Sequence, residues 1–65
     1  EESVEPVHPL VGKTGVAVSV LRPVGKARIE GKLRDVEIEG AFLEAGRAVV
    51  VTRVQGNRIT VESSE

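Results

Sequence analysis

The chain has 65 residues and a formal net charge of −1, with no Cys, one His (His8) and one aromatic residue, Phe42. This length allows one domain with a small core, because a chain of about 60 residues buries only about 60% of the surface it exposes when unfolded. The lack of Cys excludes disulfides and thiolate metal sites. The balanced charge excludes strong overall attraction to nucleic acid or anionic lipid, and no apolar run is long enough to cross a bilayer.

The two ends of the chain differ in character from its centre. Residues 1–9 are acidic at the start and contain Pro6 and Pro9, so we expect a linker or disordered tether there. The folded domain is expected over residues 10–62, followed by a frayed tail over residues 63–65. The chain begins with Glu1 rather than Met, which is consistent with a piece of a longer protein.

The first alternating run is residues 14–21. Val16, Val18 and Val20 share one face of the predicted strand, and the other face is small and weakly apolar (Gly15, Ala17, Ser19 and Leu21). We therefore expect a strand that is covered on both sides. Pro23 is expected to end it, because proline has no N–H to donate to a β-ladder.

A hairpin is predicted next. Residues 26–30 form a short strand with Ala27 and Ile29 inward, Glu30-Gly31 supplies the turn, and residues 32–39 form the third strand. Val36 and Ile38 share a face in that strand, but Leu33 does not share their parity. A bulge near Arg34-Asp35 would reconcile them.

The last part of the chain predicts a long connection and a second hairpin. Residues 40–46 interrupt the strands and could form one helical turn, with Phe42 or Leu43 plugging one end of a barrel. Residues 48–54 form the most apolar strand, for which we expect burial on both faces. Gln55-Gly56-Asn57 is a hairpin signal, and residues 58–62 close the sheet with Ile59 and Val61 inward.

These elements predict an all-β fold: a five-stranded Greek-key barrel of the oligonucleotide/oligosaccharide-binding (OB) type. An SH3-like barrel is the alternative, because the number of strands alone does not separate the two. No helical period extends over an adequate window of the sequence.

No residue pattern in the chain predicts catalysis, a cofactor or a metal site. Ser19 lies within a strand without a His or Lys partner, and the other serines lie near the ends. Asp35, Glu37 and Glu39 alternate along one strand and are interpreted as a solvated outer face with arginines as cross-strand partners. Gly12-Lys13-Thr14 lacks the upstream glycine of a phosphate loop. We therefore expect no enzymatic activity.

One charged cluster stands out. Five basic residues surround the second strand and the first hairpin, with only Glu30 to offset them: Arg22, Lys26, Arg28, Lys32 and Arg34. They are candidates for binding an acidic partner surface or anionic lipid headgroups. The simpler interpretation is that charges protect exposed strands from pairing with other chains. Binding of single-stranded nucleic acid is the less favoured alternative, since the second and third strands carry no aromatic residue on which a base could stack.

Four blocks of the sequence resemble the C-terminal soluble domain of the NfeD family. They are residues 11–17 (VGKTGVA), residues 21–31 (LRPVGKARIEG), residues 39–46 (EGAFLEAG), and residues 51–54 followed by Gly56-Asn57-Arg58-Ile59. Two details depart from the family pattern: Glu30-Gly31 stands where Asp-Gly is common, and no aromatic residue precedes Asp35.

The resemblance implies a context rather than a reaction. Proteins of the NfeD type are membrane proteins whose soluble domain is a five-stranded barrel, and they are associated with stomatin- or flotillin-like partners. Longer members carry a serine protease domain ahead of the membrane segments, so an accessory role to such a protease is a further alternative. We expect a non-enzymatic interaction domain of a membrane protein, with the cytoplasmic side favoured, that docks a stomatin- or flotillin-like protein, regulates a membrane protease or supports self-assembly.

Overall fold

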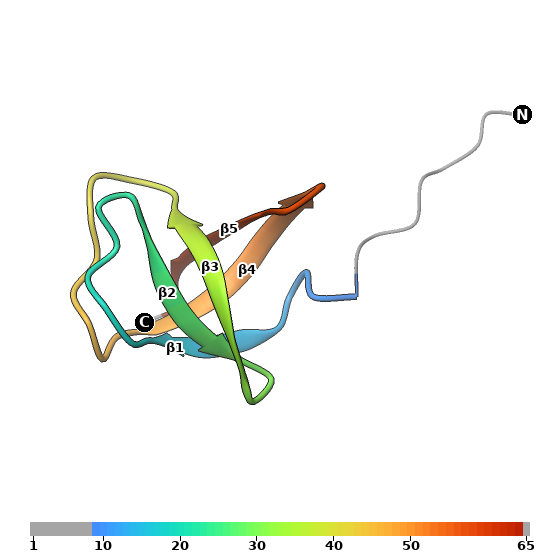
Figure 1. Ribbon diagram of the computed structural model, residues 1–65, viewed down its shortest axis with the longest axis horizontal. Helices are drawn as coiled ribbons and strands as arrows, with labels where there is room; N and C mark the ends of the chain where they lie inside the picture. Colours follow the sequence, from blue (N-terminus) through green and yellow to red (C-terminus); the bar gives the residue numbers. More distant parts are fainter. Residues whose placement is uncertain (1–8, 65) are drawn as a thin grey trace, which may run out of the picture.

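In the computed structural model, which describes residues 9–64, five strands close into a barrel in the order β1-β2-β3-β5-β4 (Figure 1). The strands are β1 (Thr14–Ala17), β2 (Val24–Ile29), β3 (Lys32–Ile38), β4 (Ala48–Gln55) and β5 (Arg58–Ser63). β1 pairs with both β2 and β4, and only β3 and β5 run parallel, through two residue pairs. This topology confirms the predicted all-β, OB-like barrel, and no helix occurs within residues 9–64.

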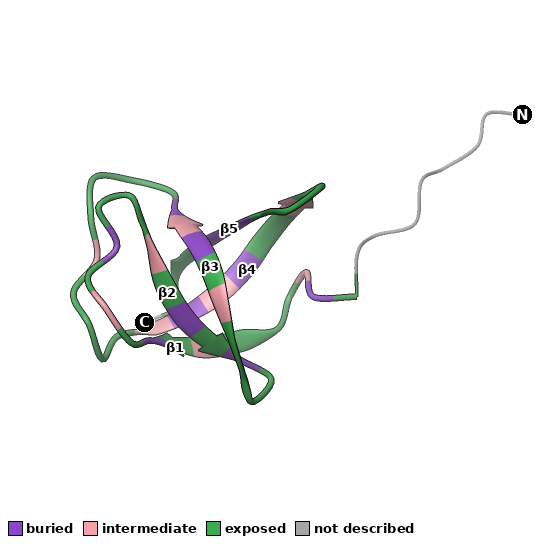
Figure 2. Ribbon diagram, viewed as in Figure 1, coloured by how far each residue is buried: buried purple, intermediate pink, exposed green. Residues whose placement is uncertain are grey.

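The barrel interior is filled by alternate residues of the strands (Figure 2). The predicted inward residues of β2 and β5 are all buried: Ala27, Ile29, Ile59 and Val61. Val36 and Ile38 of β3, which were predicted to share a face, are buried together. Leu10 also joins the core, at the point where the described chain begins. The predicted tether over residues 1–9 falls almost wholly outside the described residues, and β5 extends through Ser63, one residue into the predicted tail.

The first strand differs from its prediction in length and in the side that it buries. It ends at Ala17 rather than near Pro23, and Leu21 makes only an isolated bridge with Leu43. The face with Ala17 and Leu21 points inward, whereas Val16 and Val18 are 45% and 44% exposed. The expectation of cover on both sides was therefore wrong. The reason lies in the register of β1 with β2, which places the small Gly15 and Ala17 opposite the buried Ile29 and Ala27 and turns the valine between them outward.

The third strand contains no bulge. Its register against β2 runs without a break from Val24↔Glu37 to Ile29↔Lys32, so the predicted bulge near Arg34-Asp35 was wrong. No bulge is needed to bring Leu33 onto the face of Val36 and Ile38, because Leu33 points outward and is 56% exposed. The irregularity that the barrel does use lies between β4 and β5, where the register shifts between Val51 and Arg53.

The connection from β3 to β4 is extended and contains no helical turn, contrary to the helical option. Leu43 packs against the core and exchanges two backbone hydrogen bonds of 2.9 Å with Leu21, so it closes this side of the barrel as expected. Phe42, the other residue expected there, is 56% exposed, because neighbouring positions of an extended segment point in opposite directions. In β4, Val49 and Val51 are buried but Val50 is only half-buried, so burial on both faces is incomplete.

The β2–β3 hairpin has the predicted two-residue turn. Both central residues have positive φ, 55° for Glu30 and 80° for Gly31, which is the geometry of a type I′ turn. Glycine adopts this conformation without cost, whereas a residue with a Cβ atom loses roughly 1–2 kcal/mol there. Glu30 therefore carries backbone strain that asparagine would reduce.

We expect the substitution Glu30→Asn to raise the stability of the domain by about 0.5–1 kcal/mol, because Asn tolerates the left-handed conformation better than Glu. For a domain of this size the thermal midpoint should rise by about 2–8 °C, measured by circular dichroism. Glu30→Gln is the matched control, since it removes the same charge without that tolerance. An equal gain in both variants would assign the effect to charge and contradict the backbone explanation.

We expect Gly15→Ala to destabilise the barrel by about 1–3 kcal/mol, as overpacking does in cores. A Cβ atom at Gly15 would collide with the carbonyl oxygen of Arg28 and lie 2.9 Å from Cγ1 of Ile29. Backbone atoms cannot yield without separating β1 from β2. The control is Thr14→Ala, an exposed neighbour on the same strand that should change the stability by less than about 0.5 kcal/mol in urea unfolding. Equal effects of the two substitutions would show that the two strands can separate without cost.

Candidate functional site

Ser19 and most of the carboxylates of the barrel are engaged in structural contacts. Ser19 Oγ accepts a hydrogen bond of 3.0 Å from the Lys26 backbone N–H. The acidic residues of β3 and the segment after it are in exposed ion pairs with cations of neighbouring strands: Lys26–Asp35, Arg58–Glu37 (3.5 Å) and Arg53–Glu39 (3.8 Å). This agrees with a solvated outer face, although the partner of Asp35 is a lysine. Within residues 9–64, no group of three or more His or acidic residues is arranged to hold a metal ion.

A groove lies between β3 and the β4–β5 hairpin. It has a volume of about 520 Å³ and is lined by apolar residues such as Val36 and Ile59 together with Glu37 and Arg58. A smaller hollow of about 290 Å³ shares Glu37 and Arg58 with it. No aromatic side chain lines either of them, since Phe42, the one aromatic residue of the chain, lies in the connection between β3 and β4. The groove thus lacks the stacking platform on which single-stranded nucleic acid binds.

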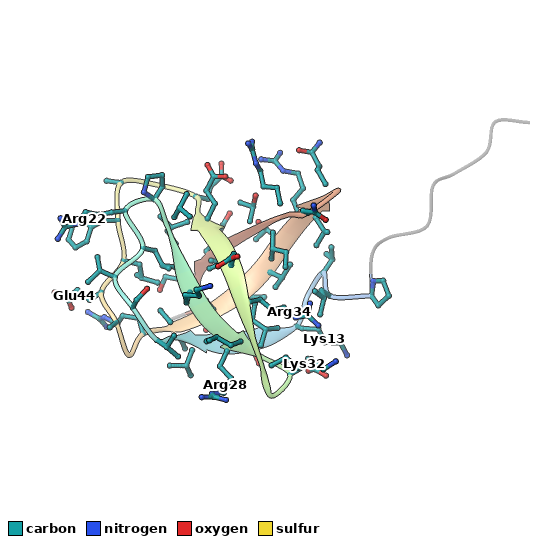
Figure 3. All side chains as sticks on the ribbon, viewed as in Figure 1. Lys13, Arg22, Arg28, Lys32, Arg34 and Glu44 are labelled. Atoms are coloured by element: carbon teal, nitrogen blue, oxygen red, sulfur yellow. The ribbon has the colours of Figure 1, made fainter. Side chains whose placement is uncertain are left out.

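The five predicted basic residues do not form one cluster. In the β2–β3 ladder Lys26 lies opposite Asp35 and Arg28 opposite Leu33, so these two cations belong to the outer face. Arg34 lies opposite the buried Ala27 and has the parity of the barrel interior. Arg22 lies apart from the others, on the side of the barrel where the loops lie and where Glu44 also lies (Figure 3).

Lys32 and Arg34 lie instead at the end of the barrel where the described chain begins, together with Lys13 (Figure 3). Sequence reasoning missed Lys13 as a member of this group. Its position is fixed by the turn that leads into β1, where the Lys13 N–H donates to Leu10 O and Lys13 O accepts from the Val51 N–H, each at 2.9 Å. We call Lys13, Lys32 and Arg34 the basic barrel end.

The outer wall next to this end carries an apolar row that the fold does not bury. Val16 of β1, Arg28 of β2 and Leu33 of β3 lie side by side in register, and all three are exposed. The half-buried Ala48 of β4 continues the row on the other side of Val16. We call Val16, Arg28 and Leu33 the outer stripe. Exposed apolar residues in a continuous row, with a cation among them, are typical of interaction surfaces.

Comparisons with known proteins show the family to which the chain belongs. The sequence model of the NfeD-like C-terminal, partner-binding domain matches residues 7–62. Membrane protein NfeD1b of Bacillus subtilis (strain 168) is 42% identical over 52 residues, which are 80% of this chain and 12% of that protein. The chain therefore spans about one eighth of the length of this relative.

Two solved structures share the fold. The C-terminal domain of stomatin operon partner protein 1510-C from Pyrococcus horikoshii superposes with a TM-score of 0.81 at 24% identity, over 86% of this chain and 89% of that one. The soluble domain of a membrane protein implicated in regulation of membrane protease activity, from Corynebacterium glutamicum, gives 0.77 at 20% identity, over 86% and 94%.

The fold and these likenesses define a small OB-like barrel of the class found as a partner-binding domain in membrane proteins. The chain belongs to the NfeD family, as its four sequence blocks predicted. Among residues 9–64 there is no helix that is long and apolar enough to span a membrane.

Proposed function

We propose that this domain is a non-enzymatic docking module of a larger membrane protein and that it binds a stomatin- or flotillin-like partner through the outer stripe. Two proteins of the same fold support the kind of partner: one is a domain of a stomatin operon partner protein, and the other is the soluble domain of a membrane protein implicated in regulation of membrane protease activity. Docking of a partner on the cytoplasmic side would allow the parent protein to influence such a protease without chemistry of its own.

The observation that carries the proposal is the exposure of the stripe. Val16 and Leu33 are 45% and 56% exposed on either side of Arg28, in a 65-residue chain that has few apolar residues to spare for its core. Arg28 is in no ion pair within residues 9–64, whereas the neighbouring Lys26 is paired with Asp35. Arginine is among the residue types enriched in binding hot spots, and a partner that covers Val16 and Leu33 would remove water from around Arg28.

Of the five basic candidates, the proposal therefore gives the partner contact to Arg28. Lys26 flanks the stripe but already has a carboxylate partner. Arg22 lies away from the stripe, so it supplies a comparison rather than a contact (Figure 3).

The test is binding of the 65-residue chain to a stomatin-like protein from the same source organism, measured by biolayer interferometry. We expect Leu33→Ser and Arg28→Glu each to weaken binding at least about tenfold, as the loss of a hot spot does. Both side chains are exposed, so the fold should tolerate the changes. The matched control is Arg22→Glu, which makes the same charge reversal outside the stripe and should leave the affinity within about twofold. Unchanged binding by the two stripe variants would overturn the use of this surface, and absence of binding by the unaltered chain would overturn the choice of partner.

A further inference from the structure

The basic barrel end is a second feature with no role in the fold or in the proposed docking. Lys32 lies opposite the buried Ile29 in the β2–β3 ladder, and Arg34 lies opposite the buried Ala27, so both have the parity of the barrel interior. Lys13 precedes Gly15 by two residues, and Gly15 lies opposite the same Ile29. The strand register therefore directs three cations to one end of the barrel, as Figure 3 also shows.

The three cations have no acidic partner within residues 9–64. The carboxylates of Asp35, Glu37, Glu39 and Glu44 are each paired with another cation, either on the outer face or on the side of the loops. The acid closest in the chain is Glu30, at the tip of the β2–β3 turn, and it is in no ion pair there either. The basic barrel end thus carries uncompensated positive charge in a chain whose net charge is −1.

Arg34 supplies an independent sign that a ligand is expected there. It is half-buried, and its Nε atom is buried without any hydrogen-bond partner. A buried donor of a charged group is costly when unpaired, and native structures seldom leave one without a reason. An anion that approaches this end would provide the compensating charge.

We propose that Lys13, Lys32 and Arg34 bind the phosphate groups of anionic membrane lipids and orient the domain on the bilayer. Guanidinium and ammonium groups together suit phosphate oxygens, with Arg as the directional donor and Lys as the point charge. The place of these residues in the fold favours lipid as the source of phosphate. The family model describes a C-terminal domain, so the membrane part of such proteins precedes it in the chain. The described chain enters the barrel at Leu10, which lies beside Lys13, so the basic barrel end lies at the point of entry.

Because the net charge of the chain is small, the bilayer does not attract the domain as a whole, and the local contact orients the domain on the membrane. Basic residues near an anionic bilayer each contribute about 1 kcal/mol, and the effect decays within a Debye length of about 10 Å. Cations gathered at one end gain this attraction only when that end faces the lipid. Apart from Glu30, the acidic residues of β3 and of the connection after it lie outside this end and disfavour orientations that turn them toward the lipid.

The experiment is co-sedimentation of the 65-residue chain with vesicles of phosphatidylcholine containing 30% phosphatidylglycerol or none, a composition chosen as roughly that of a strongly anionic bilayer. We expect binding only to the anionic vesicles, lost at about 0.5 M NaCl because salt screens the contact. The double substitution Lys13→Glu/Lys32→Glu should lower the partition coefficient at least about tenfold. Both lysines are exposed, and circular dichroism will verify that the variant folds.

The matched control is Arg22→Glu/Arg53→Glu, which makes the same net charge change away from this end and should retain most of the binding. Equal loss in both double variants, or no binding to anionic vesicles, would overturn the proposal. Leu33→Ser should bind vesicles normally, and its loss of vesicle binding would move the lipid contact to the outer stripe. Lys13→Glu/Lys32→Glu should in turn keep its affinity for a stomatin-like partner in the absence of membrane, so the two proposals can fail separately.

Two further arms separate other anions from lipid. Inorganic phosphate and a short poly-glutamate peptide are titrated into the chain while the amide signals of Lys32 and Arg34 are followed by NMR. Weak phosphate binding together with vesicle binding supports the proposal. Binding of phosphate or of the acidic peptide without vesicle binding would overturn the assignment to the membrane.

Discussion

The close approach of β1 and β2 is the constraint on which the rest of the barrel depends. Ala17 faces Ala27 in the interior, and Gly15 lies so near the Arg28 carbonyl that no side chain fits there. Since β1 carries only Gly15 and Ala17 at its inward positions, the valine that alternates with them faces outward. The exposure of Val16 follows directly from that alternation. The outer stripe is thus a product of how the barrel closes, and the domain retains it although burying Val16 and Leu33 would add stability.

The same ladder also determines where the core ends. The inward positions of β3 read, from the C-terminal end, Ile38, Val36, Arg34 and Lys32, so the apolar series gives way to cations halfway along the strand. Leu10 covers the core at this point, and its turn places Lys13 beside them. A barrel with so few residues cannot fill both ends with apolar side chains. The hydrophobic core therefore ends at the basic barrel end.

The sequence predicted best what local chemistry determines. Both hairpin turns and the inward residues of β2 and β5 were predicted correctly. A two-residue turn fixes the register of the paired strands, and the alternation of residues then determines which side chains face inward. The prediction failed for β1, which was expected to be covered on both sides, because alternation separates two faces without showing whether one or both are buried. It also treated five basic residues as one patch. The Glu30-Gly31 turn already pairs Ala27 with Arg34, so the inward parity of Arg34 was available from the register. Lys13 was not, because its place depends on pairing with β4, which is distant in sequence.

The two surfaces adjoin, and their order in space suits a protein that works beside a membrane. In β3 the outward Leu33 lies between the inward Lys32 and Arg34, so the stripe runs along the outer wall directly beside the basic end. A domain held by that end against lipid headgroups would present the stripe just above the bilayer, at the height of the juxtamembrane part of another membrane protein. Such placement reduces the rotational freedom that docking would otherwise cost, so a stripe of only a few residues could hold a partner that it would bind weakly in solution. The modest size of the apolar row then becomes an advantage, because the contact is selective for partners in the same membrane.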